Sequence, residues 1–170
     1  SSSVLEYLCG FFRITVFYFN PNISLSEEYQ KRVAEQKRLI GAYNAEGKGY
    51  PISVLEGDYE PRRFFQMAQG LEDCPEGGER CFGCFDMRLR ETAIRGAEGG
   101  FDYFSTTLTV SPLKNARKLN EIGQGLAKEY GIAWLPSDFK KKEGYKRSIE
   151  LSSQYGLYRQ NYCGCIYSRR

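Results

Sequence analysis

Segments with the pattern of β-strands alternate with segments with the pattern of α-helices along the whole chain. Apolar runs rich in β-branched and aromatic residues predict strands at residues 14–19, 50–55, 101–105 and 132–135. The longer segments between them have helical periodicity, and Ser24 with Glu27 predicts a capping box at the start of one helix. Because parallel strands need crossover connections, we expect one α/β domain over residues 1–170, with three αβα layers and a mainly parallel sheet.

Two pairs of closely spaced cysteines carry the strongest chemical signal. Cys81 and Cys84 form a C-x-x-C motif, and Cys163 and Cys165 form a C-x-C motif near the C-terminus. Such spacing is found in structural zinc sites, iron–sulfur sites and redox dithiols, and it leaves all three open. A helix that begins at Cys84 predicts a lowered thiol pKa, because its N-terminus is the positive end of the helix dipole. A shared metal centre would also place both pairs on one side of the sheet, at the C-terminal strand ends.

The chain contains no histidine, which removes several classes of site at once. Ser-His-Asp catalysis, Cys-His catalysis and H-E-x-x-H zinc sites are all excluded. No run approaches the roughly 20 apolar residues of a membrane helix, and no secretory leader is visible. Six cysteines, four of them in close pairs, fit a reducing compartment better than a disulfide scaffold. We therefore expect a cytoplasmic protein that makes no membrane contact.

Positive charge is densest in residues 140–147, where five cations occur in eight residues. They are Lys140, Lys141, Lys142, Lys146 and Arg147. Such a density of cations is suited to neutralising nucleic-acid phosphates. The alternative is that these side chains are simply exposed to solvent at the start of a helix. Arg159 is suited to pair either with an anionic substrate or with a buried carboxylate.

Five segments together carry a specific pattern. They are residues 20–23 (Asn-Pro-Asn-Ile), residues 80–84 around the first cysteine pair, residues 106–115, residues 138–142, and residues 148–168 around the second pair. In these segments, and over nearly its whole length, the chain resembles the QueH-type, cobalamin-independent epoxyqueuosine reductases. The resemblance implies an adenine-nucleotide-hydrolase-like (HUP-like) α/β fold. It also implies reduction of the epoxide on a modified tRNA wobble base, the last step of queuosine formation.

The resemblance further implies a [4Fe–4S] cluster with an adjacent iron. Cys81 and Cys84 match the internal metal-binding pair of the family, and Cys163 and Cys165 match its C-terminal pair. On this interpretation the partners are a tRNA that carries epoxyqueuosine, contacted by the basic run and Arg159, and an electron donor that the sequence does not identify. Without histidine, the proton donor has to be a tyrosine, a carboxylic acid, a thiol or a metal-bound water, and Asp138 and Tyr145 are candidates by their position alone.

The resemblance has one departure. The family carries a further cysteine cluster at the end of its first strand, and this chain starts at Ser1, where that cluster would just have ended. A chain that opens at a helix cap also gives the expectation that a first strand and its cysteine loop are missing before residue 1. We therefore expect no intact cluster within residues 1–170.

Two other functions fit parts of the same pattern. In the first, the four paired thiols hold a structural zinc ion and the basic run binds RNA. In the second, the chain is a thiol–disulfide protein, which uses the C-x-x-C motif but gives no role to the second pair or to the basic run. Metal and sulfide content separates these alternatives from an iron–sulfur enzyme.

Overall fold

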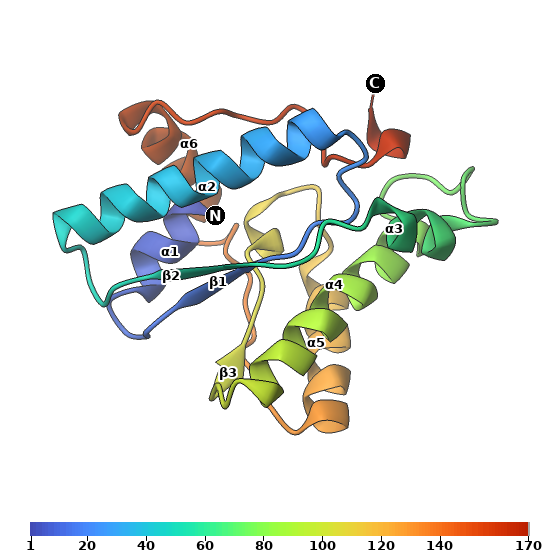
Figure 1. Ribbon diagram of the computed structural model, residues 1–170, viewed down its shortest axis with the longest axis horizontal. Helices are drawn as coiled ribbons and strands as arrows, with labels where there is room; N and C mark the ends of the chain where they lie inside the picture. The colour runs from blue at the N-terminus through green and yellow to red at the C-terminus, as the bar shows by residue number, and fades with distance from the viewer. Residues whose placement is uncertain (170) are drawn as a thin grey trace.

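The computed structural model describes residues 1–169 and shows helices alternating with short parallel strands (Figure 1). The helices are α1 (Ser2–Leu8), α2 (Ser26–Glu46), α3 (Pro61–Ala68), α4 (Glu79–Glu98), α5 (Ala116–Tyr130) and α6 (Gly144–Gln154). The strands are β1 (Thr15–Tyr18), β2 (Ser53–Glu56), β3 (Tyr103–Phe104) and β4 (Ala133–Trp134). Two short 3-10 helices, η1 (Leu108–Val110) and η2 (Ile166–Ser168), complete the order. The predicted α/β class is therefore confirmed.

The expected single sheet is wrong for this chain, because the described strands form two separate parallel pairs. Strand β1 pairs with β2, and Thr15 lies opposite Ser53. Strand β3 pairs with β4, and Tyr103 lies opposite Ala133. Residues of β1 and β3 line one large cavity, so these two strands face an open space instead of each other. The strands are also shorter than expected, with four residues each in β1 and β2 and two each in β3 and β4.

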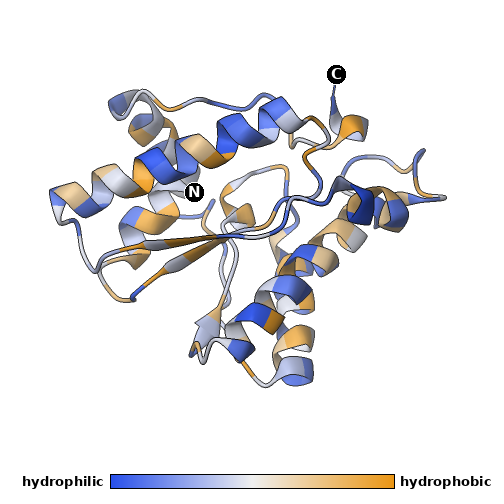
Figure 2. Ribbon diagram, in the orientation of Figure 1, coloured by the Kyte–Doolittle hydropathy of each residue, from blue (hydrophilic) through white to orange (hydrophobic). Residues whose placement is uncertain are grey.

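Each strand pair has its own hydrophobic core. Strands β3 and β4 pack against α4 and α5, and this core includes Phe85, Leu89, Phe104, Leu119 and Trp134. Helices α1 and α2 pack against the β1–β2 pair around buried residues that include Leu5, Leu39, Ile40, Tyr43 and Ile52. Figure 2 shows hydrophobic residues along both α4 and α5. Burial of these side chains is the main stabilising contribution to both layers.

The C-terminal segment returns along α2 and is bonded to it. Figure 1 shows this segment running beside α2 from α6 toward α3. Arg38 of α2 donates to the carbonyl oxygens of Tyr155 and Gly156 at 3.0 and 3.1 Å. The Ser24 hydroxyl accepts from the backbone N–H of Ile166 at 3.0 Å. Ser24 therefore does not form the expected capping box, since Leu25 is the N-cap residue and Ser24 bonds the returning segment instead.

Helix α6 is held against α1 by a two-point ion pair. Both carboxylate oxygens of Glu6 accept from Arg147, each at 2.8 Å. Such fork geometry is the stronger form of an arginine–carboxylate contact. No helix within residues 1–169 is long and apolar enough to cross a membrane.

Candidate functional site

All four paired cysteines line the same cavity, whose volume is about 2190 Å³. Polar residues that follow β1 and β3 line it too, among them Asn20, Asn22, Thr106, Thr107 and Ser111. Cys84 and Cys165 pack in one buried cluster, and Cys163 packs against its edge. The two pairs thus lie on one side of the fold, at the C-terminal strand ends, as we expected from the sequence.

The first pair lies in the first two turns of α4, directly after a loop that Arg80 holds. The Nη1 atom of Arg80 donates to the carbonyl oxygens of Leu71, Glu72 and Cys74, at 2.6 to 2.9 Å. The thiol of Cys81 accepts from the backbone N–H of Gly77 at 3.2 Å. Because Arg80 is almost fully buried, this contact fixes the loop that precedes the helix.

The expected lowering of the Cys84 pKa is wrong. Helix α4 begins at Glu79, so Cys84 lies in the second helical turn, where the dipole has weakened. Burial raises the pKa of the Cys84 thiol, and the nearby charge of Arg88 opposes that rise only in part. Desolvation of a thiolate therefore outweighs the helix N-terminus at this position.

The second pair lies in a loop bonded to α2 and to Asn22 and Ser24, in the segment between β1 and α2. Arg32, whose side chain is only 8% exposed, donates to the carbonyl oxygens of Tyr162 and Cys163, each at 3.0 Å. Gly164 has φ +112°, which only glycine adopts readily, and a Cβ there would lie 2.8 Å from Ile23. The chain can therefore pass this closely only because residue 164 is a glycine.

The pKa values of the two thiols in the second pair are shifted in opposite directions. A hydrogen bond from the Cys165 thiol lowers the pKa of Cys163, and the same contact raises that of Cys165. Ser168 Oγ lies 3.0 Å from the Cys163 sulfur and 3.0 Å from the Cys165 carbonyl oxygen. Its single proton can reach only one of these acceptors. Cys163 is thus the thiol of this pair that is held more readily as a thiolate.

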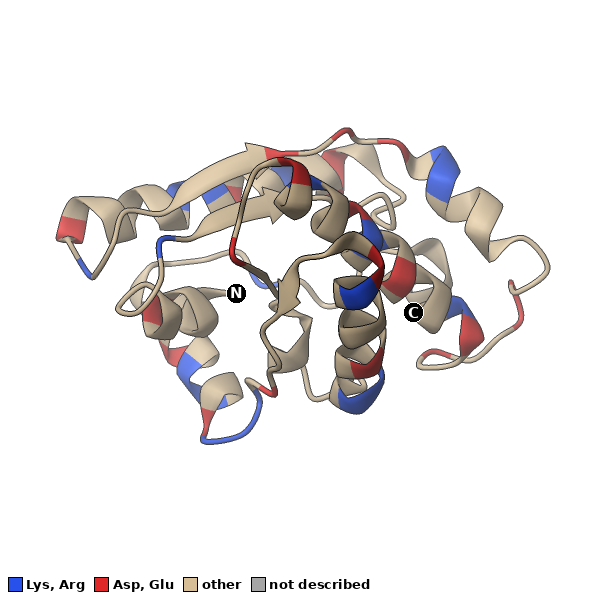
Figure 3. Ribbon diagram, turned by 90° about the horizontal axis from the view of Figure 1, so that it is seen from below, with Lys and Arg blue, Asp and Glu red and all other residues tan. Residues whose placement is uncertain are grey.

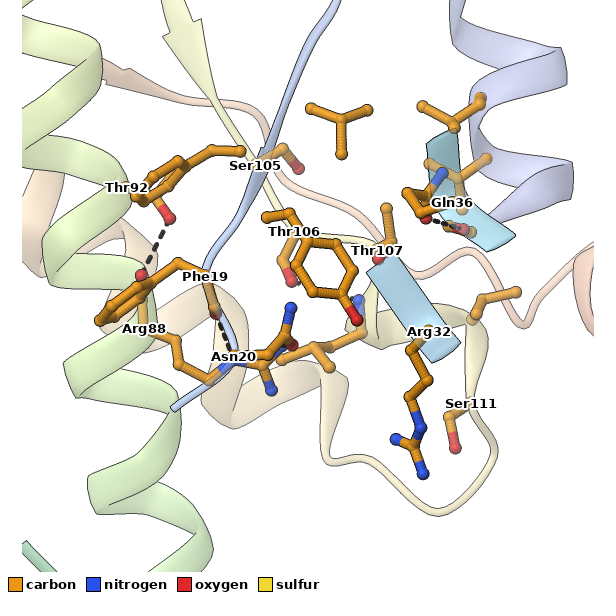
Figure 4. A pocket seen from close by; sticks show the side chains of 18 of the residues that line it. Phe19, Asn20, Arg32, Gln36, Arg88, Thr92, Ser105, Thr106, Thr107 and Ser111 are labelled. Carbon is orange, nitrogen blue, oxygen red and sulfur yellow. Dashed lines mark hydrogen bonds between the residues drawn. The ribbon is translucent and has the colours of Figure 1, made fainter. Parts of the chain in front are cut away.

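Two cations beside the thiols were not among the residues that we selected from the sequence. Arg88 and Lys114 both favour the thiolate form of Cys84 through their charge. Arg88 Nη2 donates to Asn20 Oδ1 at 2.5 Å, and Figure 4 shows Arg88, Asn20 and Thr92 on one side of the cavity, with Arg32 and Ser111 on the other. The sequence did contain a signal for Arg88, because it lies four residues after Cys84 and therefore on the same face of the predicted helix.

A sequence model of the family described as "Epoxyqueuosine reductase QueH" matches residues 1–170. The chain belongs to the QueH family. A relative named epoxyqueuosine reductase QueH from Streptococcus pyogenes is 45% identical over all of this chain and 66% of its own length. A relative with that name from Staphylococcus epidermidis is 42% identical over 99% of this chain and 71% of its own length. A third, from Thermotoga maritima, is 34% identical over 89% of this chain and 77% of its own length. The chain thus spans about two thirds to three quarters of these QueH proteins.

The structure separates the two proton-donor candidates. Tyr145 lines the cavity that holds the thiols. Asp138 does not line it, and its carboxylate oxygens lie 3.3 Å from Lys140 Nζ and 3.5 Å from Lys141 Nζ. The Asp138 carboxylate is thus engaged with two ammonium groups outside the cavity.

The basic run lies outside this cavity, in the loop before α6 and in the first turns of that helix. Besides the contacts with Asp138, Lys146 lies 3.4 Å from Glu143, and Arg147 contacts Glu6. Lys142 makes no ion pair within residues 1–169. Arg159, in contrast, lines the thiol cavity. Arg147 therefore has a structural contact, whereas Arg159 lies where an anionic group could reach it.

The described thiols do not by themselves form a complete metal site. Within residues 1–169, no three side chains of histidine, cysteine, aspartate or glutamate lie in positions to hold one metal ion. The cavity nevertheless brings four thiols and two cations together, and thiolates are ligands for soft metals.

Proposed function

We propose that this chain contains the reductase domain of an epoxyqueuosine reductase, which acts on a tRNA carrying epoxyqueuosine. The observation that carries the proposal is the family match over residues 1–170, together with relatives of the same name at 34 to 45% identity. Removing an epoxide oxygen as water consumes two electrons and two protons. The proposal includes a HUP-like fold for this single domain, supported by its parallel strand pairs and the helices that connect them.

We propose that Cys81 and Cys84 supply ligands to a [4Fe–4S] cluster and that Cys163 and Cys165 lie beside it, next to the adjacent iron. The placement of all four thiols in one cavity supports this proposal. Because the described residues do not form a complete ligand set, further ligands or a movement of these thiols would be needed. When bound, such a cluster would supply electron transfer, whereas the chain's own thiols can supply electrons only by forming a disulfide.

Tyr145 is the better proton donor of the two candidates. It lines the thiol cavity, whereas the Asp138 carboxylate is paired with two lysines outside it. A phenol is a weak acid, so it can hold its proton at neutral pH until charge develops on a nearby oxygen. On this proposal, Tyr145→Phe lowers the rate of reduction but leaves tRNA affinity unchanged, while Asp138→Asn changes the rate less.

The tRNA partner is supported by the basic run before α6 and by Arg159 at the cavity. Lys141 and Lys142 are exposed and are the best candidates for phosphate contacts in this run. We propose that Lys140, Lys146 and Arg147 reach phosphates only by exchanging their present carboxylate partners. Replacement of Lys141 and Lys142 by glutamine should therefore account for most of the run's effect on the salt dependence of tRNA binding.

The decisive experiment joins metal analysis to an activity assay. A full-length protein that contains this chain is prepared anaerobically and analysed for iron, zinc and acid-labile sulfide, and is then given epoxyqueuosine tRNA and a chemical reductant. We expect iron, sulfide, absorption near ~400 nm and loss of one oxygen atom from the nucleoside. Cys84→Ser should abolish both the iron and the product. Cys74→Ser is the matched control, because Cys74 does not line the cavity.

The result also distinguishes the alternative functions. Stoichiometric zinc without sulfide, with RNA binding but no reduction, would replace the proposal by an RNA-binding module with a structural zinc site of four thiolates. Metal-free protein that exchanges disulfides would favour the thiol–disulfide alternative.

A further inference from the structure

A second, smaller cavity lies outside the thiol site, at the end of α1, and we call it the aromatic groove. It has a volume of about 300 Å³. Its lining is entirely apolar or aromatic and consists of Tyr7, Leu8, Phe11, Phe12, Leu135, Pro136 and Phe139. Tyr7 and Phe11 are 63% and 67% exposed, and their ring centroids lie 5.5 Å apart. Two large exposed rings beside one groove are unusual on a protein surface, and such patches mark sites of interaction.

The groove lies beside the chain's excess positive charge. Phe139 of the groove is followed directly by Lys140, Lys141 and Lys142. Residues 138–147 contain five cations and two carboxylates, a net charge of +3, which equals the net charge of the whole chain. Figure 3 shows the lysine loop as a continuous basic stretch before α6. The rest of the chain is therefore electrically balanced, and its attraction for an anion is concentrated next to the groove.

The loop geometry presents these lysines to solvent. Lys142 and Glu143 have φ of +50° and +61°, and residues 141–143 are all exposed. Lys141 is 76% exposed in its side chain. An apolar groove with exposed cations at one end has the two parts that bind a nucleotide: a surface for the base and charges for the phosphate.

The aromatic groove is also continuous with the thiol cavity. Leu8, Phe11, Phe12 and Leu135 line both. Tyr145, which follows the lysine loop, lines the thiol cavity. An RNA strand bound in the aromatic groove would therefore lie next to the cavity that the thiols line.

We propose that the aromatic groove binds one unpaired nucleotide of an RNA, with its base against Tyr7 and Phe11 and its phosphate near Lys141 and Lys142. This inference rests on the proposed tRNA partner and adds a binding surface to it. The lining offers no hydrogen-bonding side chain other than the Tyr7 hydroxyl, so recognition depends on stacking and tolerates different bases. A second copy of the chain fits less well, because a symmetric contact would bring the same basic segment against itself.

The test measures binding of the intact chain to a labelled RNA hairpin with an unpaired loop, by fluorescence anisotropy at several salt concentrations. The double variant Tyr7→Ala/Phe11→Ala should bind about tenfold more weakly, with an unchanged salt slope, because it removes stacking and no charge. Lys141→Gln/Lys142→Gln should instead flatten the log–log slope by about 0.7 per lost contact. Phe65→Ala, at an exposed aromatic residue that lines neither cavity, is the matched control and should bind normally.

The outcomes that overturn the inference are distinct. Unchanged RNA affinity in the Tyr7/Phe11 variant would overturn it and leave the proposed function standing, whereas an intact chain that binds no RNA would overturn both. Loss of self-association in sedimentation, or loss of binding to anionic vesicles, without loss of RNA binding would assign the groove to a second copy or to a membrane surface. Both rings are mostly exposed, so the variant should keep the wild-type Tm, and a thermal scan checks that it is folded.

Discussion

Arg32→Ala should loosen the loop that carries the second cysteine pair, although Arg32 is 131 residues away in sequence. Arg32 lies in α2 and joins three groups: the Glu28 carboxylate at 2.6 Å and the carbonyl oxygens of Tyr162 and Cys163. The alanine variant removes all three bonds. It also leaves a mostly buried carboxylate without its cationic partner.

The expected loss of stability follows from these contacts. Removing one partner of a buried ion pair costs about 3 to 5 kcal/mol. The Tyr158 hydroxyl still donates to Glu28, at 3.0 to 3.1 Å, so the lower end of that range applies. We therefore expect about 3 kcal/mol, which corresponds to a decrease in Tm of about 6 to 12 °C for a domain of this size.

The assay combines thermal unfolding with the rate at which Cys163 reacts with a thiol reagent. Arg38→Ala is the control, because Arg38 lies on the same helix and also bonds the returning segment, but its side chain is 49% exposed. We expect the control to lose less than about 1 kcal/mol and to leave Cys163 reactivity unchanged. Equal losses of unfolding free energy in the two variants would refute the proposal that the buried Arg32 holds the loop of the second cysteine pair. An unchanged rate of Cys163 modification in Arg32→Ala would refute it as well.

Two further predictions concern packing and charge. Gly123→Ala should cost about 1 to 3 kcal/mol and shift the fluorescence of Trp134, the only tryptophan, because the new Cβ would lie 2.3 to 2.6 Å from its ring. Gly125→Ala, where the Cβ meets open space, should be neutral or stabilising by up to about 1 kcal/mol, and equal effects at both positions would contradict this account. The hydrogen bonds from Arg147 hold the pKa of Glu6 below its usual value, so their contribution is present above about pH 4.3 and is lost as the pH falls through the lowered pKa. Urea unfolding should therefore show Arg147→Gln less stable than the parent at pH 7, with a gap that narrows toward pH 3; a constant gap would exclude an electrostatic origin.

Local sequence patterns were sufficient for the class of fold and for identifying the cysteine pairs that line the cavity. Periodicity and β-branched runs place the helices and strands, because these patterns arise from the backbone geometry of each element alone. The close spacing of Cys81 with Cys84, and of Cys163 with Cys165, is also a local pattern, and it marks these four thiols as candidate site residues. The absence of histidine is likewise a property of composition, and it limits the available chemistry whatever the fold.

What the tertiary structure decided is which distant groups meet and how much water surrounds them. Ser24 has the sequence context of a helix cap, yet its hydroxyl accepts from Ile166, which lies 142 residues later. Cys84 follows a helix start, yet burial raises its pKa, because desolvation depends on neighbours from other elements. Arg32 has the sequence context of a solvated helical arginine, yet the fold places the Cys163 carbonyl within its reach. The residue types and their spacing were thus determined by the sequence alone, whereas their partners, protonation and exposure depended on packing between segments far apart in the chain.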